Sequence, residues 1–155
     1  MSRFYFVAVI LVFGVLALSM VFAAAKIGYF IDYATLIILT VPSLALSLAT
    51  FPPRDIRRSF TAAFTRRAST EAELRVAAVF FRSLERYFLL SGLIGALIGT
   101  VTVLAQVRDI EAVAMGFSLL LLSVFYALVL MLALAVPFRA AVDRKLAALR
   151  QPSGT

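Results

Sequence analysis

The sequence predicts an all-α membrane protein with four transmembrane helices, both termini in the cytoplasm, and helices three and four extended into the cytoplasm. Hydrophobic residues make up 63% of the 155 residues and charged residues only 15%. A soluble core of this length cannot bury that much apolar surface, so part of it must face lipid. Four stretches contain no charge and approach or exceed the ~20 residues that a spanning helix needs: residues 4–25, 33–51, 87–107 and 112–138. Residues 1–155 are therefore expected to form a single membrane domain.

The first stretch fits two interpretations. Arg3 before it and Ala23, Ala24 and Ala25 at its end are typical of a signal peptide with a cleavage site. Its apolar run exceeds the ~7–15 residues of a signal core, so a retained helix is expected. The second stretch contains Pro42, which a membrane helix tolerates when its neighbours satisfy the freed carbonyl.

The distribution of basic residues predicts the orientation. In a four-helix arrangement, 13 of the 15 Lys and Arg residues fall on one side, and only Lys26 and Arg108 fall on the other. Basic loops are retained in the cytoplasm, so both termini and residues 52–86 are expected there. Setting the orientation in the membrane accounts for the net charge of +7, so no nucleic-acid partner is expected. The short outer loops are expected to hold Asp32, Asp109 and Glu111.

The polar segment 52–86 is expected to contain two helices. Pro52 and Pro53 end the second membrane helix. Apolar residues then fall on one helical face and arginines on another, a pattern that predicts a helix lying at the inner membrane interface; the apolar residues are Ile56, Phe60, Ala63 and Phe64. Thr70 and Glu73 form a capping-box pattern, so the third membrane helix should begin near Glu71.

The fourth membrane helix is expected to continue beyond the bilayer. It should run through Arg139 to about Leu149, within the cytoplasmic tail 139–155. Residues 151–155 are expected to fray.

The composition argues against an enzyme. The chain has no Cys and no His, which excludes thiolate or imidazole metal sites, cysteine nucleophiles and histidine acid–base catalysis. No phosphate-binding glycine loop is present, and no cofactor or metal is expected. None of the eight Asp and Glu residues falls in a predicted membrane stretch. Ion-coupled transporters usually keep an ionisable residue there, so any ion movement would need a carboxylate from another chain.

Three groups of residues are candidates for function. Thr100, Thr102 and Ser123 are expected either to line an ion path or to donate to carbonyls of their own helix. Gly92, Gly95 and Gly99 form a stripe of small residues that allows close helix packing. A third group consists of arginines that set orientation and contact lipid phosphates or a cytoplasmic partner: Arg54, Arg57, Arg58, Arg66 and Arg67.

Several motifs resemble the MotA/TolQ/ExbB proton-channel family, and MotA most closely. Residues 28–38, GYFIDYATLII, with ATFP at 49–52, resemble the second membrane helix of MotA. GALIGTV at 95–101 resembles the family's G-T-V turn, and LLSVFYA at 121–127 followed by Pro137 resembles its fourth helix. Val103 and Val124 stand where that family usually has Gly and Thr. The large cytoplasmic domain of the flagellar members is absent, so a shortened stator subunit serving another envelope machine is expected.

This resemblance implies a motor protein. Such subunits form a pentamer around two copies of a partner with one membrane helix, and the partner's membrane aspartate carries the ion. Helices three and four line the central space, while helices one and two face lipid. Proton or sodium flow is thereby converted into mechanical work. The alternative is a four-helix membrane scaffold that docks a cytoplasmic partner without ion flow.

Overall fold

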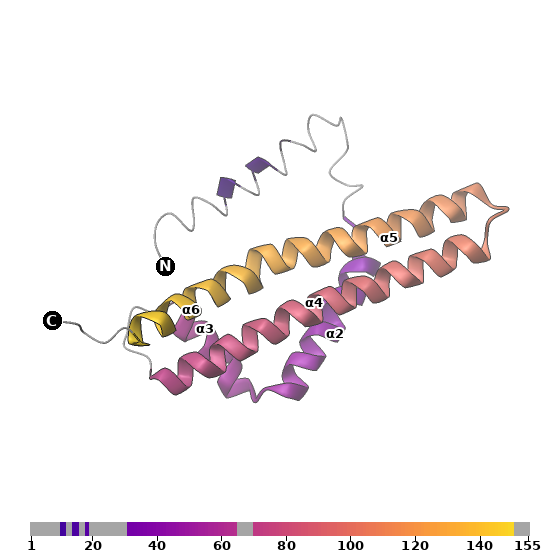
Figure 1. The fold of residues 1–155 in the computed structure, drawn as a ribbon. Helices are drawn as coiled ribbons and strands as arrows, with labels where there is room; N and C mark the ends of the chain where they lie inside the picture. Colours follow the sequence, from indigo (N-terminus) through magenta and orange to yellow (C-terminus); the bar gives the residue numbers. More distant parts are fainter. Residues whose placement is uncertain (1–9, 12–13, 16–17, 19–30, 65–69, 151–155) are drawn as a thin grey trace.

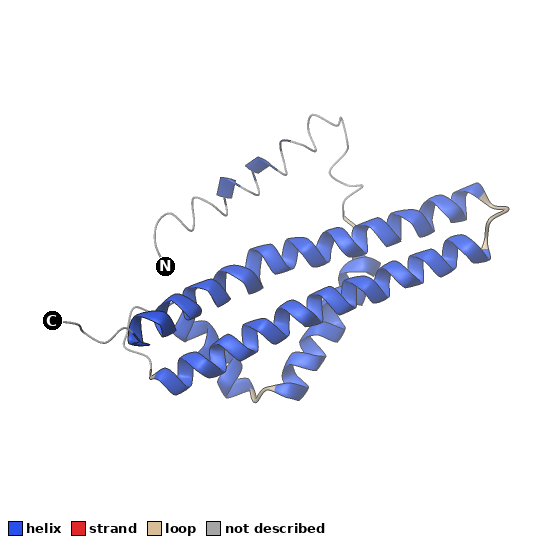
Figure 2. Cartoon of the chain, viewed as in Figure 1, coloured by secondary structure: helices blue, strands red, loops and turns tan. Residues whose placement is uncertain are grey.

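The computed structural model describes residues 10–11, 14–15, 18, 31–64 and 70–150, and these residues are helical apart from short connections (Figures 1 and 2). The elements are α2 (Tyr33–Thr50), α3 (Pro53–Phe64), α4 (Glu71–Ala105), α5 (Ile110–Leu130), the π-helix η2 (Met131–Ala135) and α6 (Val136–Arg150). Most of the predicted first helix and its signal-peptide alternative, together with Arg66 and Arg67, lie outside the described residues.

Three of the described helices are long and apolar enough to cross a membrane. They are α2, α4 and the continuous helix Ile110–Leu149. These three correspond to the second, third and fourth predicted membrane stretches. The all-helical fold class is therefore confirmed for the part of the chain that the structure describes.

The start of α4 follows from a local sequence signal. The Thr70 hydroxyl accepts a hydrogen bond from the Glu73 N–H at 3.3 Å, and the Glu73 carboxylate accepts one from the Thr70 N–H at 3.2 Å. This reciprocal pair satisfies two amide donors that have no partner inside the helix. The capping box is thus confirmed. With 35 residues, α4 is about 52 Å long at ~1.5 Å per residue, well beyond the ~30 Å of a hydrocarbon core.

A single helix continues from Ile110 to Arg150 despite Pro137. Proline has no N–H to donate to the preceding turn, and its ring crowds that turn. The π-helix η2 lies just before it, and the Val136 N–H donates to the Met131 carbonyl five residues earlier. This wider turn accommodates the proline without ending the helix. As predicted, the helix continues through Arg139 to about Leu149; its last residue is Arg150.

The main apolar core lies at one end of the molecule. We name this part the inner bundle: α3, α6 and residues 71–88 of α4, which pack together at the end opposite the α4–α5 turn (Figure 1). Phe81, Leu74 and Val142 are fully buried there. Six phenylalanines make ring contacts with centroids between 4.8 and 5.8 Å apart: Phe51, Phe60, Phe64, Phe80, Phe81 and Phe138.

The apolar face of α3 packs against protein. Ala63 is fully buried, and the Phe60 ring lies 5.3 Å from that of Phe81 and 5.6 Å from that of Phe138. The sequence predicted a helix at the inner membrane interface. Its apolar face packs on α4 and α6, and its place relative to the membrane stays a prediction. An amphipathic pattern shows that one face must leave water, but α4 and α6 satisfy it as well as lipid does.

The helix α2 packs on α4 through small polar residues. Thr35, Ser43 and Ser47 are buried on one of its faces. The Ser43 and Ser91 hydroxyls lie 3.1 Å apart, and the Thr50 and Tyr87 hydroxyls lie 2.8 Å apart. Hydroxyl pairs and small side chains of this kind are typical of helix contacts in a membrane.

Candidate functional site

The centre of the apolar region is the contact between α4 and α5, where glycines bring the two helices together. A methyl group added at Gly99 would lie 2.6 Å from the Gly116 carbonyl oxygen, and one at Gly92 would lie 2.5 Å from the Ala127 Cβ. At Gly95 it would collide with the Ser123 side chain. The stripe of Gly92, Gly95 and Gly99 therefore packs α4 against α5 of the same chain.

The three hydroxyl residues proposed for an ion path all donate to carbonyls of their own helices. The Thr100 hydroxyl lies 2.8 Å from the Ala96 carbonyl oxygen, and the Thr102 hydroxyl lies 3.0 Å from that of Ile98. The Ser123 hydroxyl donates to the Leu119 carbonyl at 2.7 Å. Ser123 is buried against Gly95, whereas Thr100 is only partly buried. The structure does not bring the three hydroxyls to one point, and Thr100 and Thr102 are the two that a neighbouring chain could reach.

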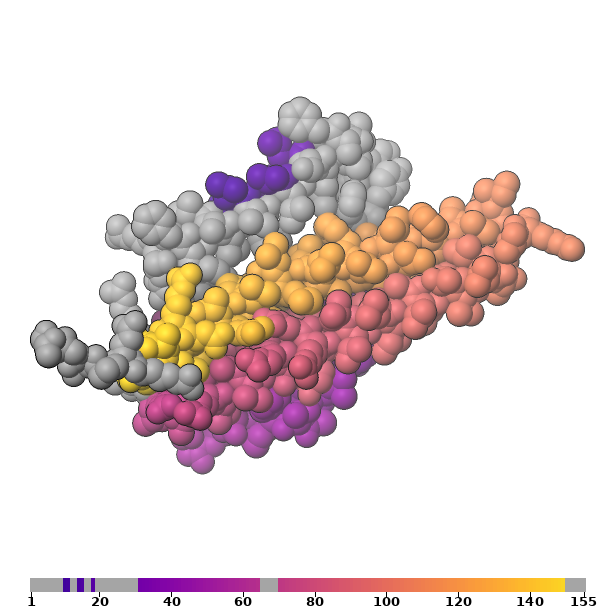
Figure 3. Space-filling model, in the orientation of Figure 1, coloured from indigo at the N-terminus to yellow at the C-terminus, as the bar shows by residue number. Residues whose placement is uncertain are grey.

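Beyond this contact, the two helices form a pair that α2 does not cover. We name it the outer hairpin: residues 96–105 of α4 and 110–122 of α5. Its ends at Ala105 and Ile110 project beyond α2 (Figures 1 and 3). The exposed fractions of Leu97, Val101 and Leu104 are 64%, 64% and 69%. Apolar exposure on this scale is typical of a surface that meets lipid or another helix.

Asp32 contacts α5 far from the turn that joins α4 to α5. Its N–H donates to the Tyr126 hydroxyl at 3.0 Å. Tyr126 is 16 residues after Ile110, or about 24 Å along α5 at ~1.5 Å per residue. The carboxylate caps α2, accepting from the Ala34 N–H at 3.2 Å, the Thr35 N–H at 3.1 Å and the Thr35 hydroxyl. Asp109 caps α5 at the tip, whereas Asp32 contacts α5 at Tyr126. That both residues lie on the outer side of the membrane stays a prediction.

The candidate arginines of α3 differ in their surroundings from the other arginines of the inner bundle. Arg139 pairs with Glu85 at 2.7 Å and approaches Asp143 at 3.5 Å, and Arg75 pairs with Glu71 at 2.6 Å. Arg54, Arg57 and Arg58 are exposed and form no ion pair with any residue that the structure describes. These three remain available for an anionic surface.

Lys145 fixes the end of α3. Its ammonium donates to the Ala62 carbonyl, one of the last four carbonyls of α3, which lack partners within that helix. Burial of the ammonium lowers the pKa of Lys145. The contact holds α3 against α6.

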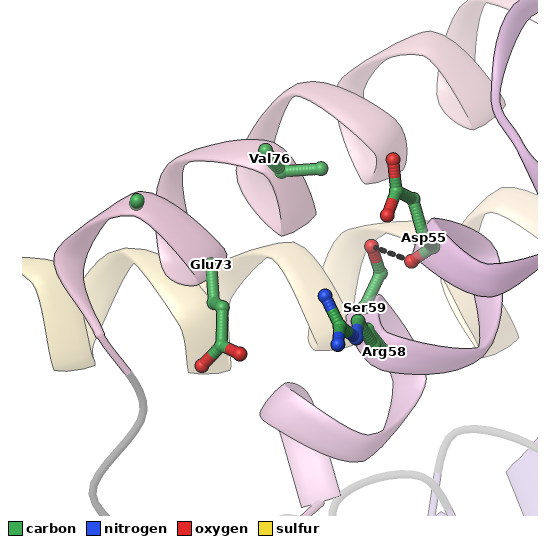
Figure 4. A pocket seen from close by; sticks show the side chains of 6 residues that line it. Asp55, Arg58, Ser59, Glu73 and Val76 are labelled. Atoms are coloured by element: carbon green, nitrogen blue, oxygen red, sulfur yellow. Dashed lines mark hydrogen bonds between the residues drawn. The ribbon is translucent and has the colours of Figure 1, made fainter.

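A small pocket lies between α3 and α4. It has a volume of about 210 Å³ and is lined by Asp55, Arg58, Ser59, Ala72, Glu73 and Val76 (Figure 4). The Ser59 hydroxyl donates to the Asp55 carbonyl, and Glu73 serves the capping box. Nowhere in the described ranges do three acidic side chains come together as metal ligands.

Comparison with known proteins adds no relative: no family model matches the sequence, and no curated protein is similar to it.

Proposed function

We propose that this chain is an ion-channel subunit of a motor of the MotA/TolQ/ExbB type. Several copies, five by the resemblance, form a ring around a partner with one membrane helix. That partner supplies a membrane aspartate, and proton or sodium flow is converted into mechanical work. The motif order described above motivates this proposal.

The uncovered outer hairpin is the observation that carries the proposal. Two helices of apolar surface project beyond α2, and the partly buried Thr100 lies on that projecting part. Within a ring, neighbouring copies and the partner helix would cover this surface. The Thr100 hydroxyl can donate to Ala96 and still accept from water, so it can share a hydrated path with a partner carboxylate.

The inner bundle supports a mechanical role. Its ring contacts and the Arg139–Glu85 ion pair tie α3, α4 and α6 into one unit. Because α4 and α6 are continuous with the membrane helices, a rotation of the hairpin would move this unit as a whole. A bacterial inner-membrane location with both termini inside belongs to the same proposal.

Flux measurements test the function. The chain and a candidate partner are reconstituted in vesicles, and proton and sodium uptake are followed. Thr100→Val keeps the side-chain shape and removes a hydroxyl that donates within its own helix, so folding should survive while flux falls at least tenfold. Unchanged flux would remove Thr100 from the path.

Native mass spectrometry of the solubilised protein should show pentamers, and a stable monomer would refute the ring.

Labelling tests the topology. The chain has no cysteine, so single cysteines at Ser69 and Gly28 report their sides without background. They should react from opposite faces of the membrane. Reaction of both from outside would reject the orientation.

A scaffold that docks an anionic cytoplasmic partner is the second candidate. Arg54, Arg57 and Arg58 on α3 favour it, because they form no ion pair with the described residues and offer three guanidinium groups on one helix. Absence of flux with every candidate partner, together with binding that is lost in the triple Gln variant, would support the scaffold.

A further inference from the structure

Two boundaries of charge indicate how the hairpin would sit in a bilayer. On α4, the uncharged residues 87–107 number 21 and span about 31 Å at ~1.5 Å per residue, which matches a hydrocarbon core of ~30 Å. They are bounded by Arg86 on one side and Arg108 on the other. A bilayer that covers the exposed Leu97, Val101 and Leu104 must reach the tip of the hairpin.

Asp32 falls between these boundaries. Gly95 of α4 packs against Ile38, six residues after Asp32. Gly95 lies nine residues from Arg86 and 13 residues from Arg108, or about 14 Å and 20 Å along α4. The start of α2 therefore lies inside the apolar layer. An ionisable residue at that depth is rare and usually functional.

We propose that Asp32 is a membrane-embedded, proton-binding carboxyl group at which this chain itself takes up and releases a proton. This goes beyond the channel proposed above, in which the partner supplies the carboxylate, and it needs no partner chain.

The surroundings of Asp32 exert two opposing effects. Three donors, the N–H groups of Ala34 and Thr35 and the Thr35 hydroxyl, stabilise the ionised carboxylate. Surrounding hydrocarbon disfavours the same charge, and no basic side chain described in the structure pairs with it. Protonation removes the charge, and the proton leaves to water when the carboxylate forms again.

Among the residues that the structure describes, few other titratable groups lie near Asp32. Tyr126 on α5 contacts the backbone of residue 32, and Tyr33 on α2 is 76% exposed. Facing α2, α4 presents Gly92 and Gly95 next to Leu39 and Ile38. The charged groups at the tip, Arg108, Asp109 and Glu111, lie more than 20 Å away along α5, at ~1.5 Å per residue.

Infrared spectroscopy of the full chain in phospholipid bilayers tests the proposal. A protonated carboxyl band should be present near neutral pH, disappear as the pH is raised, and be absent from Asp32→Asn. Asn caps a helix as well as Asp does, so this variant should fold. Asp109→Asn is the matched control, since Asp109 also caps a helix but lies at the tip; it should keep the band. An unchanged band in Asp32→Asn, or no band in the native chain, would show that Asp32 is a helix cap only.

A second measurement tests the depth without altering Asp32. Tyr33→Cys and Ile110→Cys place single thiols at positions 76% and 84% exposed. A membrane-impermeant maleimide should label the Ile110→Cys protein at least tenfold faster. Equal rates would place the start of α2 in water and overturn the proposal.

Discussion

The inner bundle and the outer hairpin are built by different physical means, although α4 runs through both. In the inner bundle, phenylalanine side chains form a buried core, and the described ion pairs of Arg75 and Arg139 lie around it. In the outer hairpin, the helices touch through Gly99 and Gly116, and leucine and valine side chains point outward. The hydrophobic effect drives the first arrangement because water is the alternative. It gives the second no advantage in lipid, where close backbone packing must hold the helices together.

The largest expected effect comes from the inner core. Phe81 is fully buried, and Phe81→Ala should lower the free energy of unfolding by about 3–5 kcal/mol through lost burial and a new cavity. Leu97→Ala is the matched change in the outer hairpin, where the side chain is 64% exposed, and should stay within about 0.5 kcal/mol. Denaturant unfolding of the detergent-solubilised protein measures both. If Leu97→Ala lowered the free energy of unfolding as much as Phe81→Ala, the distinction between the two regions would not hold.

The next effect concerns the contact between α4 and α5. Gly99→Ala places a methyl group 2.6 Å from backbone atoms of Gly116 and Leu120, so the helices must separate at a cost of about 1–3 kcal/mol. Gly14→Ala is the control, because a methyl group there meets nothing within 4 Å. Thermal unfolding in detergent should show a lower midpoint for the first variant only. Tolerance of alanine at Gly99 would mean that the hairpin is looser than described.

A smaller effect is expected for the ion pairs. Arg139→Gln leaves Glu85, which is only 14% exposed, without its cationic partner and should cost about 1–2 kcal/mol after screening of the partly exposed arginine. Arg75→Gln breaks an exposed pair within α4 and should cost no more than about 0.5 kcal/mol. The free energies of unfolding of the two variants are measured at low and at high salt and compared. Equal losses would mean that burial of Glu85 contributes nothing.

The smallest effect is a dependence on pH that originates in the inner bundle. Burial lowers the pKa of Lys145 below the ordinary value of a lysine, so the unfolded chain binds more protons in the alkaline range between the two pKa values. Stability should therefore rise slightly as pH increases through this window. In Lys145→Gln this rise should be missing. A rise of the same size in the variant would assign it to another group.

Local signals in the sequence determined where helices begin and which stretches are apolar. Thr70 and Glu73 predict the first turn of α4 because a capping box involves only neighbouring residues. The uncharged stretches predict the long helices because length and polarity are properties of the segment alone. The end of the last helix near Leu149 was also predicted, whereas the π-turn that accommodates Pro137 was not.

Only the tertiary structure decided what each face touches. A stripe of glycines predicts close helix packing, but it does not specify that the helix packed against it is α5 of the same chain. The apolar side of α3 could have met lipid, and it meets Phe81 and Phe138 instead. The depth of Asp32 depends on a hydrogen bond to a residue 94 positions away. The spacing of apolar residues in a helix shows that one face must leave water. Which surface covers that face depends on how all the helices pack together.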